Sequence, residues 1–146
     1  MKKIIFWVGI GMTAFSSQAQ VSIEMVADIN PAEEGHGEPR NLFLFNDNIY
    51  FTANIGTTGI ELWMTDGTEE GTTMVKDINA FGDESSFPGG FAIHEGQLFF
   101  SAETEEAGKE LWVTDGTTDG TTLFMDIYPG AGGSSPISLT SIGDLL

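Results

Sequence analysis

Cysteine is absent from the 146 residues of this chain, and basic side chains are few. Without thiols, the sequence excludes disulfide scaffolds, thiolate zinc sites and cysteine nucleophiles. Five basic residues against 22 acidic ones give a net charge of −17, so phosphate backbones and anionic membrane surfaces would be repelled. We therefore expect no nucleic acid as a partner. A hydrophobic content of 40% argues against a disordered acidic tail.

The sequence also lacks a sustained helical period and the motifs of common enzymes. It has no G-x-S-x-G elbow, H-E-x-x-H pair, phosphate-binding loop or dinucleotide fingerprint. Nineteen glycines punctuate short apolar runs instead, which is typical of β-strands joined by tight turns. The sequence therefore predicts an all-β protein and offers no catalytic residue.

The first 19 residues have the three parts of an export signal. Two lysines precede an apolar run, and Ala19 ends a stretch of small residues suited to cleavage. The apolar run is too short to cross about 30 Å of hydrocarbon, so we expect a signal peptide at 1–19 and no membrane span. This predicts a secreted or cell-surface protein. After cleavage, three basic residues remain: Arg40, Lys76 and Lys109.

A repeat with a period of 49 residues organises the rest of the chain. The segment 61–68 returns as the segment 110–117, and both copies are followed by Gly-Thr-Thr. Self-similarity at a fixed period is the signature of stacked structural units. The residues of the repeated motif are Glu61, Leu62, Trp63, Asp66, Gly67 and Thr68, then Glu110, Leu111, Trp112, Asp115, Gly116 and Thr117.

Each unit contains four short runs of β-favouring residues. Two-residue turns at 46–47 and 95–96 predict hairpins, whereas roughly a dozen residues rich in Gly, Pro and Ser after Ile78 predict a crossing to a second sheet. The sequence therefore predicts antiparallel four-stranded repeat blades in an incomplete β-propeller-like array. The expected parts are a lone strand at 20–30 that could close a ring, blade 1 at 42–79, blade 2 at 91–128 and the start of a truncated third blade at 129–146.

The two repeated tryptophans, Trp63 and Trp112, allow two interpretations. They either pack between blades or form a platform on which a ligand stacks. One tryptophan per unit at a fixed phase favours packing, with the indole N–H reaching a loop carbonyl.

Aspartates precede the two long crossing segments. Asp77 and Asp126 each lie shortly before a pair of serines, at 85–86 and 134–135. Because aspartate side chains accept hydrogen bonds from nearby amides, we expect both residues to cap these serine amides.

Asp66 and Asp115 also allow two roles. In an Asp-Gly-Thr sequence, the aspartate accepts hydrogen bonds from amides two residues on and glycine supplies a positive φ, which favours a turn. Calcium binding is the alternative, since hard cations take several oxygen ligands and the chain is acidic. No EF-hand loop or nonapeptide array accompanies them, so both are weak calcium candidates. No other cofactor is expected.

With Glu-Leu-Trp-x-x-Asp-Gly-Thr present twice, each copy followed by a strand ending in Asp-Ile, the chain resembles the ELWxxDGT repeat family over residues 21–146. Members of that family look like secreted or cell-surface bacterial proteins, commonly longer, and often with a C-terminal sorting domain of the type IX secretion system. The resemblance implies an exported repeat scaffold, further repeats in the full-length chain and no catalytic residues to carry over.

Two functions follow from these patterns. We expect an interaction or adhesion module without catalytic activity of its own, whose partner is a protein or polysaccharide surface. The alternative is a fragment of a propeller-type extracellular enzyme, quinoprotein-like or a hydrolase, with its active site in missing residues. The segment 108–112 is similar to the Gly-Lys-x-Leu-Trp strand of quinoprotein propellers. A longer reading frame that adds only repeats would favour the module.

Overall fold

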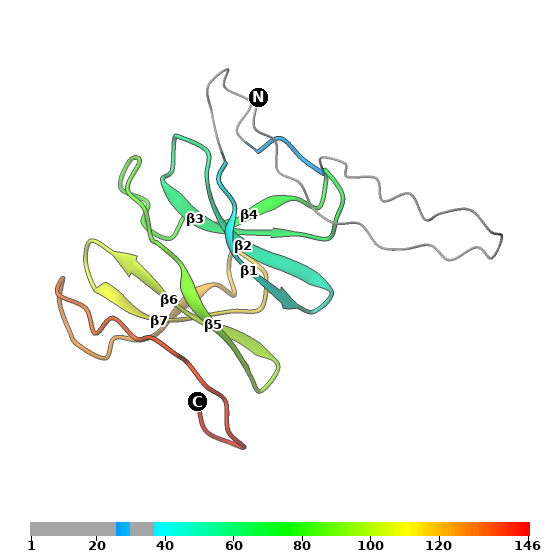
Figure 1. Ribbon diagram of the computed structural model, residues 1–146. Helices are drawn as coiled ribbons and strands as arrows, with labels where there is room; N and C mark the ends of the chain where they lie inside the picture. The colour runs from blue at the N-terminus through cyan, green and yellow to red at the C-terminus, as the bar shows by residue number, and fades with distance from the viewer. Residues whose placement is uncertain (1–25, 30–36) are drawn as a thin grey trace.

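A computed structural model describes residues 26–29 and 37–146 of the chain (Figure 1). These residues form eight β-strands and no helix, arranged as two four-stranded antiparallel sheets. Both sheets are simple meanders, with the orders β1-β2-β3-β4 and β5-β6-β7-β8. The all-β, four-stranded antiparallel prediction is confirmed. The strands are β1 (Arg40–Phe45), β2 (Asn48–Asn54), β3 (Ile60–Thr65), β4 (Thr73–Lys76), β5 (Gly89–His94), β6 (Gln97–Thr104), β7 (Gly108–Thr114) and β8 (Thr122–Met125).

Two-residue turns join the first two strands of each sheet. All four turn residues have a positive φ: Asn46 (48°), Asp47 (62°), Glu95 (48°) and Gly96 (75°). This is the backbone of a type I′ turn, whose twist matches that of the flanking strands. Phe45 pairs with Asn48, and His94 pairs with Gln97. The two predicted hairpins are therefore confirmed.

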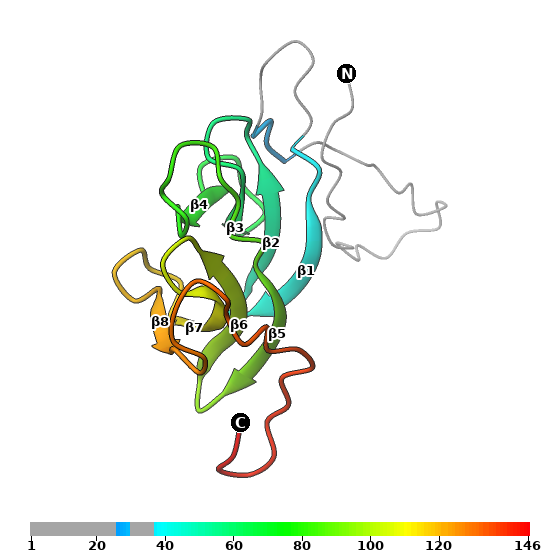
Figure 2. The ribbon, with the colours of Figure 1, turned by 90° about the vertical axis from the view of Figure 1, so that its left-hand side faces the viewer.

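The two sheets lie against each other, and the segment between β4 and β5 carries the chain from one to the other. Figure 2 shows β1 and β5 on one side of the molecule and β4 and β8 on the other. The strands of the first sheet start and end slightly before the bounds 42–79, and those of the second sheet slightly before the bounds 91–128.

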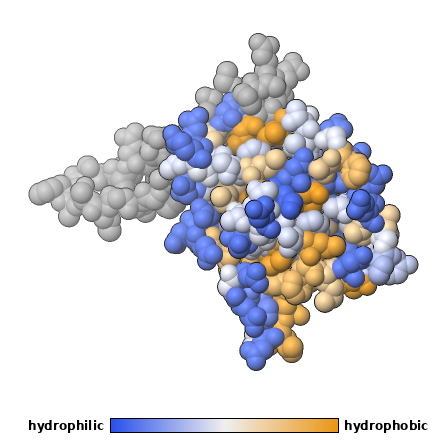
Figure 3. All heavy atoms as spheres, turned by 180° about the vertical axis from the view of Figure 1, so that it is seen from behind, coloured by the Kyte–Doolittle hydropathy of each residue, from blue (hydrophilic) through white to orange (hydrophobic). Residues whose placement is uncertain are grey.

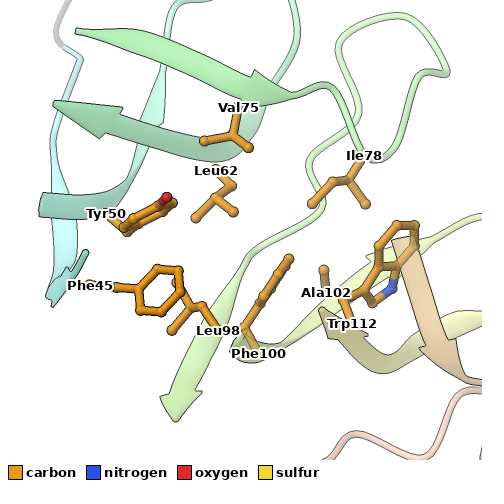
Figure 4. Close-up of a cluster of buried hydrophobic side chains, with 9 residues drawn as sticks. All are labelled: Phe45, Tyr50, Leu62, Val75, Ile78, Leu98, Phe100, Ala102 and Trp112. Atoms are coloured by element: carbon orange, nitrogen blue, oxygen red, sulfur yellow. The ribbon is translucent and has the colours of Figure 1, made fainter. Parts of the chain in front are cut away.

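The main hydrophobic core lies between the two sheets, where unlike faces of the repeat unit meet (Figure 4). Trp112 points from the second sheet into this core, whereas Trp63 lies on the other face of the first sheet with Phe51 and Ala53. A contact between unlike faces is heterologous. The buried core residues are Phe45, Tyr50, Leu62, Val75, Ile78, Leu98, Phe100, Ala102 and Trp112.

The N-terminal parts predicted from the sequence, at 1–19 and 20–30, are described only in part. The signal peptide at 1–19 and most of the lone strand expected at 20–30 lie outside the described residues. The described part, 26–29, is not a strand, and it packs on the outer face of the first sheet through Val26 and Ile29. Within the described ranges no helix is long and apolar enough to cross a membrane.

The segment 129–146, expected to start a third blade, forms no strand. It contains a single β-bridge between Ile142 and Leu145. A strand is held by a ladder of hydrogen bonds to a paired neighbour, whereas this segment has one β-bridge and one backbone hydrogen bond to β7, from Ser135 N to Lys109 O at 2.8 Å. A third blade therefore stays a prediction.

Candidate functional site

Glu61, the first residue of the repeated motif, holds the crossing segment against the first sheet. Its side chain on β3 is fully buried, and Oε2 accepts a hydrogen bond from Ile78 N at 3.0 Å. Ser86 N donates to Oε1 at 2.9 Å, and the Ser86 hydroxyl donates to Oε2. One carboxylate thus binds both ends of the segment that links the sheets. Burial raises the pKa of Glu61 to about 7, although hydrogen bonds from Ser86 and Ile78 act to lower it.

Glu110 forms a similar arrangement in the second unit, in which Ser134, the counterpart of Ser85 at the 49-residue offset, takes the place of Ser86. Its carboxylate accepts hydrogen bonds from Ile127 N at 3.0 Å and from Ser134 N and Oγ, both at 2.6 Å. Burial raises the pKa of Glu110, but the hydrogen bonds from Ser134, Ile127 and Tyr128 outweigh it and lower the pKa below its usual value. The repeated glutamate is therefore a structural clamp in both units.

The prediction that Asp77 and Asp126 cap the serine amides is wrong. Glu61 and Glu110 accept those hydrogen bonds instead. Asp77 Oδ1 is buried, with no hydrogen-bond partner among the described residues. Strand β3 lies beside β4, so the crossing segment that follows β4 folds back over the glutamate, a proximity across strands that sequence spacing does not reveal.

The Asp-Gly-Thr segments form closed turns in both units. Asp66 Oδ1 accepts hydrogen bonds from Thr68 N at 2.9 Å and from Thr68 Oγ1 at 2.7 Å. Thr68 Oγ1 accepts in turn from Gly71 N at 2.9 Å, and the hydroxyls of Thr65 and Thr72 meet at 2.7 Å beneath the turn. The second unit repeats each of these contacts. The threonine pair was not assigned from the sequence, although it recurs with the same period.

The two calcium candidates, Asp66 and Asp115, are both exposed and engaged in these turns. The hydroxyl and amide of Thr68 lower the pKa of Asp66, and the amide and hydroxyl of Thr117 lower that of Asp115. In the part of the chain that the structure describes, no three His, Cys, Asp or Glu side chains gather in a metal-binding group. The geometry supports the turn role, and calcium binding stays a prediction.

A double-mutant cycle can test whether the turn depends on its aspartate. A β-carbon at Gly71 would overlap the Asp66 carboxylate, so Gly71→Ala should push that carboxylate out of the turn and lower the melting temperature. In an Asp66→Ala background, Gly71→Ala should lower the melting temperature less, because the carboxylate that the new β-carbon would overlap is absent. Thermal unfolding of the four proteins measures this coupling. Strictly additive losses would show that the carboxylate does not occupy this position.

The repeated tryptophans are packing residues. Trp112 is 7% exposed between the sheets, and Trp63 is 8% exposed beneath Val26 and Ile29. Neither offers an open face to a ligand. The expected hydrogen bond to a loop carbonyl is wrong for both, because each indole Nε1 is buried with no partner among the described residues.

The turn of the second unit also contacts the first sheet. The Tyr50 hydroxyl lies over Gly116, where a β-carbon would overlap it. Burial and the charge of Asp115 raise the pKa of Tyr50. Thr118 Oγ1 donates to Val75 O at 2.8 Å, and Lys76 Nζ donates to Thr121 O at 2.7 Å. The turn of the second unit thus helps to join it to the first sheet.

A groove of about 1000 Å³ opens where the chain enters β1 and β5, and the segment 136–138 forms part of its wall. Arg40 and Lys109 line it, which are two of the three basic residues outside the export signal. Arg40 Nη2 forms an ion pair with Glu38 Oε2 at 2.8 Å, and Lys109 Nζ donates to Phe87 O at 3.2 Å. The sequence alone did not reveal this site, although the scarcity of basic residues was a signal.

A scan against family models and searches of curated proteins and of solved structures each found no match to this chain. The resemblance to the ELWxxDGT repeat family therefore stays a prediction.

Proposed function

We propose that this protein is a secreted or cell-surface repeat scaffold that serves as an interaction or adhesion module, without catalytic activity of its own. Its units would stack as blades of an incomplete β-propeller-like array. The export signal expected at 1–19 supports the location. The use of the repeated residues supports the scaffold, because the clamp at Glu61, the tryptophans and the Asp-Gly-Thr turns all serve packing or turn formation.

Residues that differ between the units are available for a partner. Arg40 corresponds to Gly89 and Phe87 corresponds to Glu38 at the 49-residue offset, and all four line the groove. In repeat proteins, the repeated residues build the scaffold while varied residues on one surface provide binding. The groove is therefore the binding surface that we assign to this module.

The observation that carries the scaffold proposal is the contact between unlike faces. Tyr50 and Leu62 of the first sheet meet Phe100 and Trp112 of the second. A heterologous contact of this kind leaves the same type of face free after each added unit, and so generates rings or open arrays. The same contact could therefore accept another unit.

The second sheet presents that face, and only part of it is exposed, because Leu139 packs against the buried side chains of Phe99, Leu111 and Val113. Ile127 and Phe124 are 49% and 51% exposed, whereas Ile78 and Val75, their counterparts in the first unit, are buried between the sheets. Figure 3 shows apolar side chains gathered over the lower part of the molecule, which the second sheet and the segment 129–146 form. We infer that its occupant is a further repeat unit, which presents a phenylalanine, an alanine and a tryptophan as the second unit does to the first.

An added unit tests this proposal. Residues 129–146 are replaced by a copy of residues 80–128, which continues the 49-residue register. The free energy of unfolding in urea should rise by about 3 kcal/mol or more, because burial of two large apolar side chains contributes about 1.5–3 kcal/mol each. As a control, alanine replaces the copied tryptophan, and most of the gain should disappear. A three-unit chain no more stable than the original would contradict the array.

A further inference from the structure

The groove combines positive charge, polar groups and an exposed aromatic ring in a chain that is otherwise strongly acidic. It is lined by Arg40 and Lys109, by the amides and hydroxyls of Asn41 and Ser101, and by the ring of Phe87. Among the described residues, Glu38 is the only acidic one that lines it with them. This concentration of basic side chains singles the groove out on the described surface.

Both basic side chains have donors left for a ligand. Arg40 is 70% exposed at its side chain and forms one ion pair, with Glu38. A guanidinium has five N–H donors in a fork that matches a carboxylate, so one hydrogen bond leaves most of the fork available. Lys109 donates to Phe87 O, and an ammonium group has three donors. The groove can therefore bind an anionic group with two cations.

The backbone around the groove is held in an unusual conformation. Glu38, Asn41 and Phe87 have φ angles of 38°, 55° and 45°, in the left-handed region that non-glycine residues rarely occupy. Hydrogen bonds keep this geometry, with Phe87 N donating to Ile60 O at 3.3 Å and Asn41 Nδ2 donating to Pro88 O at 3.4 Å. Such conformations gather at ligand sites, where the surrounding structure maintains them. Here the result is a Phe87 side chain that is 50% exposed beside the two basic residues.

We propose that this groove binds a polysaccharide that carries carboxylate groups, such as a polymer of uronic acids. Arg40 and Lys109 bind the carboxylates, and Phe87 packs against the apolar face of a sugar ring. The guanidinium fork of Arg40 matches the two oxygens of a carboxylate, and the two cations of the groove offset locally the repulsion that the net charge of −17 exerts on an anionic polymer. This inference rests on the proposed binding role of the module and names its ligand class.

The test measures binding of the purified chain to polygalacturonate, with dextran as the neutral comparison and poly-L-glutamate as the acidic peptide comparison. We expect polygalacturonate to bind and dextran not to bind at low salt. Arg40→Gln and Lys109→Gln should each weaken binding about tenfold or more, since each removes a charge-assisted hydrogen bond. Phe87→Ala should weaken it with no change in charge.

Lys76→Gln is the matched control, because it changes the net charge equally but lies outside the groove and contacts Thr121 O. It should leave the affinity unchanged. The proposal would be overturned if Lys76→Gln weakened binding as much as Arg40→Gln does. It would also be overturned if poly-L-glutamate or dextran bound as tightly as polygalacturonate. Melting curves check folding, and if Arg40→Gln unfolds the chain, Arg40→Lys should still weaken binding by removing the fork. If an added repeat unit stabilises the chain but polygalacturonate does not bind, the ligand class is rejected and the scaffold proposal is retained.

Discussion

Replacement of Trp112 by alanine should lower the free energy of unfolding by about 3–5 kcal/mol. The indole ring fills the core between the sheets together with Ile78, Phe100 and Ala102 (Figure 4). Without the ring, the protein loses the free energy of burying a large apolar surface. A cavity also remains, because the two packed sheets cannot move together to fill it. Because the indole N–H has no partner among the described residues, the substitution breaks no hydrogen bond, and the loss comes from packing alone. Urea unfolding measures the change.

Phe124→Ala is the matched control for this prediction. Phe124 is an aromatic residue of the same sheet but is 51% exposed, and its loss should change the stability by less than about 1 kcal/mol. If Trp112→Ala also changed the stability by less than about 1 kcal/mol, the indole would not be a core residue. A ligand role would then have to be reconsidered.

Glu61→Ala should lower the free energy of unfolding by about 2–4 kcal/mol at about pH 5. The substitution leaves Ile78 N, Ser86 N and the Ser86 hydroxyl without an acceptor in a buried site, and each orphaned donor is unfavourable by about 1–3 kcal/mol. Part of this loss is recovered, because a buried acidic group no longer has to be desolvated. Urea unfolding of wild type and variant at a series of pH values measures the difference.

The same pair of proteins should show a characteristic pH dependence. The pKa of Glu61 is raised to about 7 in the folded state, above the ordinary value near 4.5, so the folded state binds this proton more tightly than the unfolded state. The contribution of Glu61 is therefore fully present below about pH 4.5 and declines as the pH rises through about 7. The stability difference between wild type and Glu61→Ala should shrink over that range.

Glu110→Ala provides the matched control for the clamp. It removes the same side chain from the second unit, where no further unit covers the clamp among the described residues and the pKa is lowered rather than raised. The loss of stability should be smaller, because water can reach the partly buried donors that the variant leaves. The difference from wild type should not shrink between pH 4.5 and 7. Equal losses and equal pH profiles for both variants would contradict a difference between the environments of the two glutamates.

The order of strands within each sheet was predictable because it depends on local chemistry. Asn46-Asp47 and Glu95-Gly96 have the residues of a type I′ turn, and short links can only join neighbouring antiparallel strands. The long link after Ile78 similarly predicted a second sheet. The acceptor for Ser86 was not predictable, because Glu61 and Ser86 meet only when the crossing segment folds back over β3.

The sequence by itself determined the repeat unit, its 49-residue period, the hairpins and the acidic charge, since turns and strand patterns depend on residues close in the chain. The tertiary structure decided what each face of the unit does. Trp63 and Trp112 occupy the same position in the repeat, yet one lies between the sheets and the other beneath Val26 and Ile29. The tertiary structure also places Arg40 and Lys109 in one groove. The reason is that the contact between sheets joins unlike faces, so identical sequences acquire different neighbours.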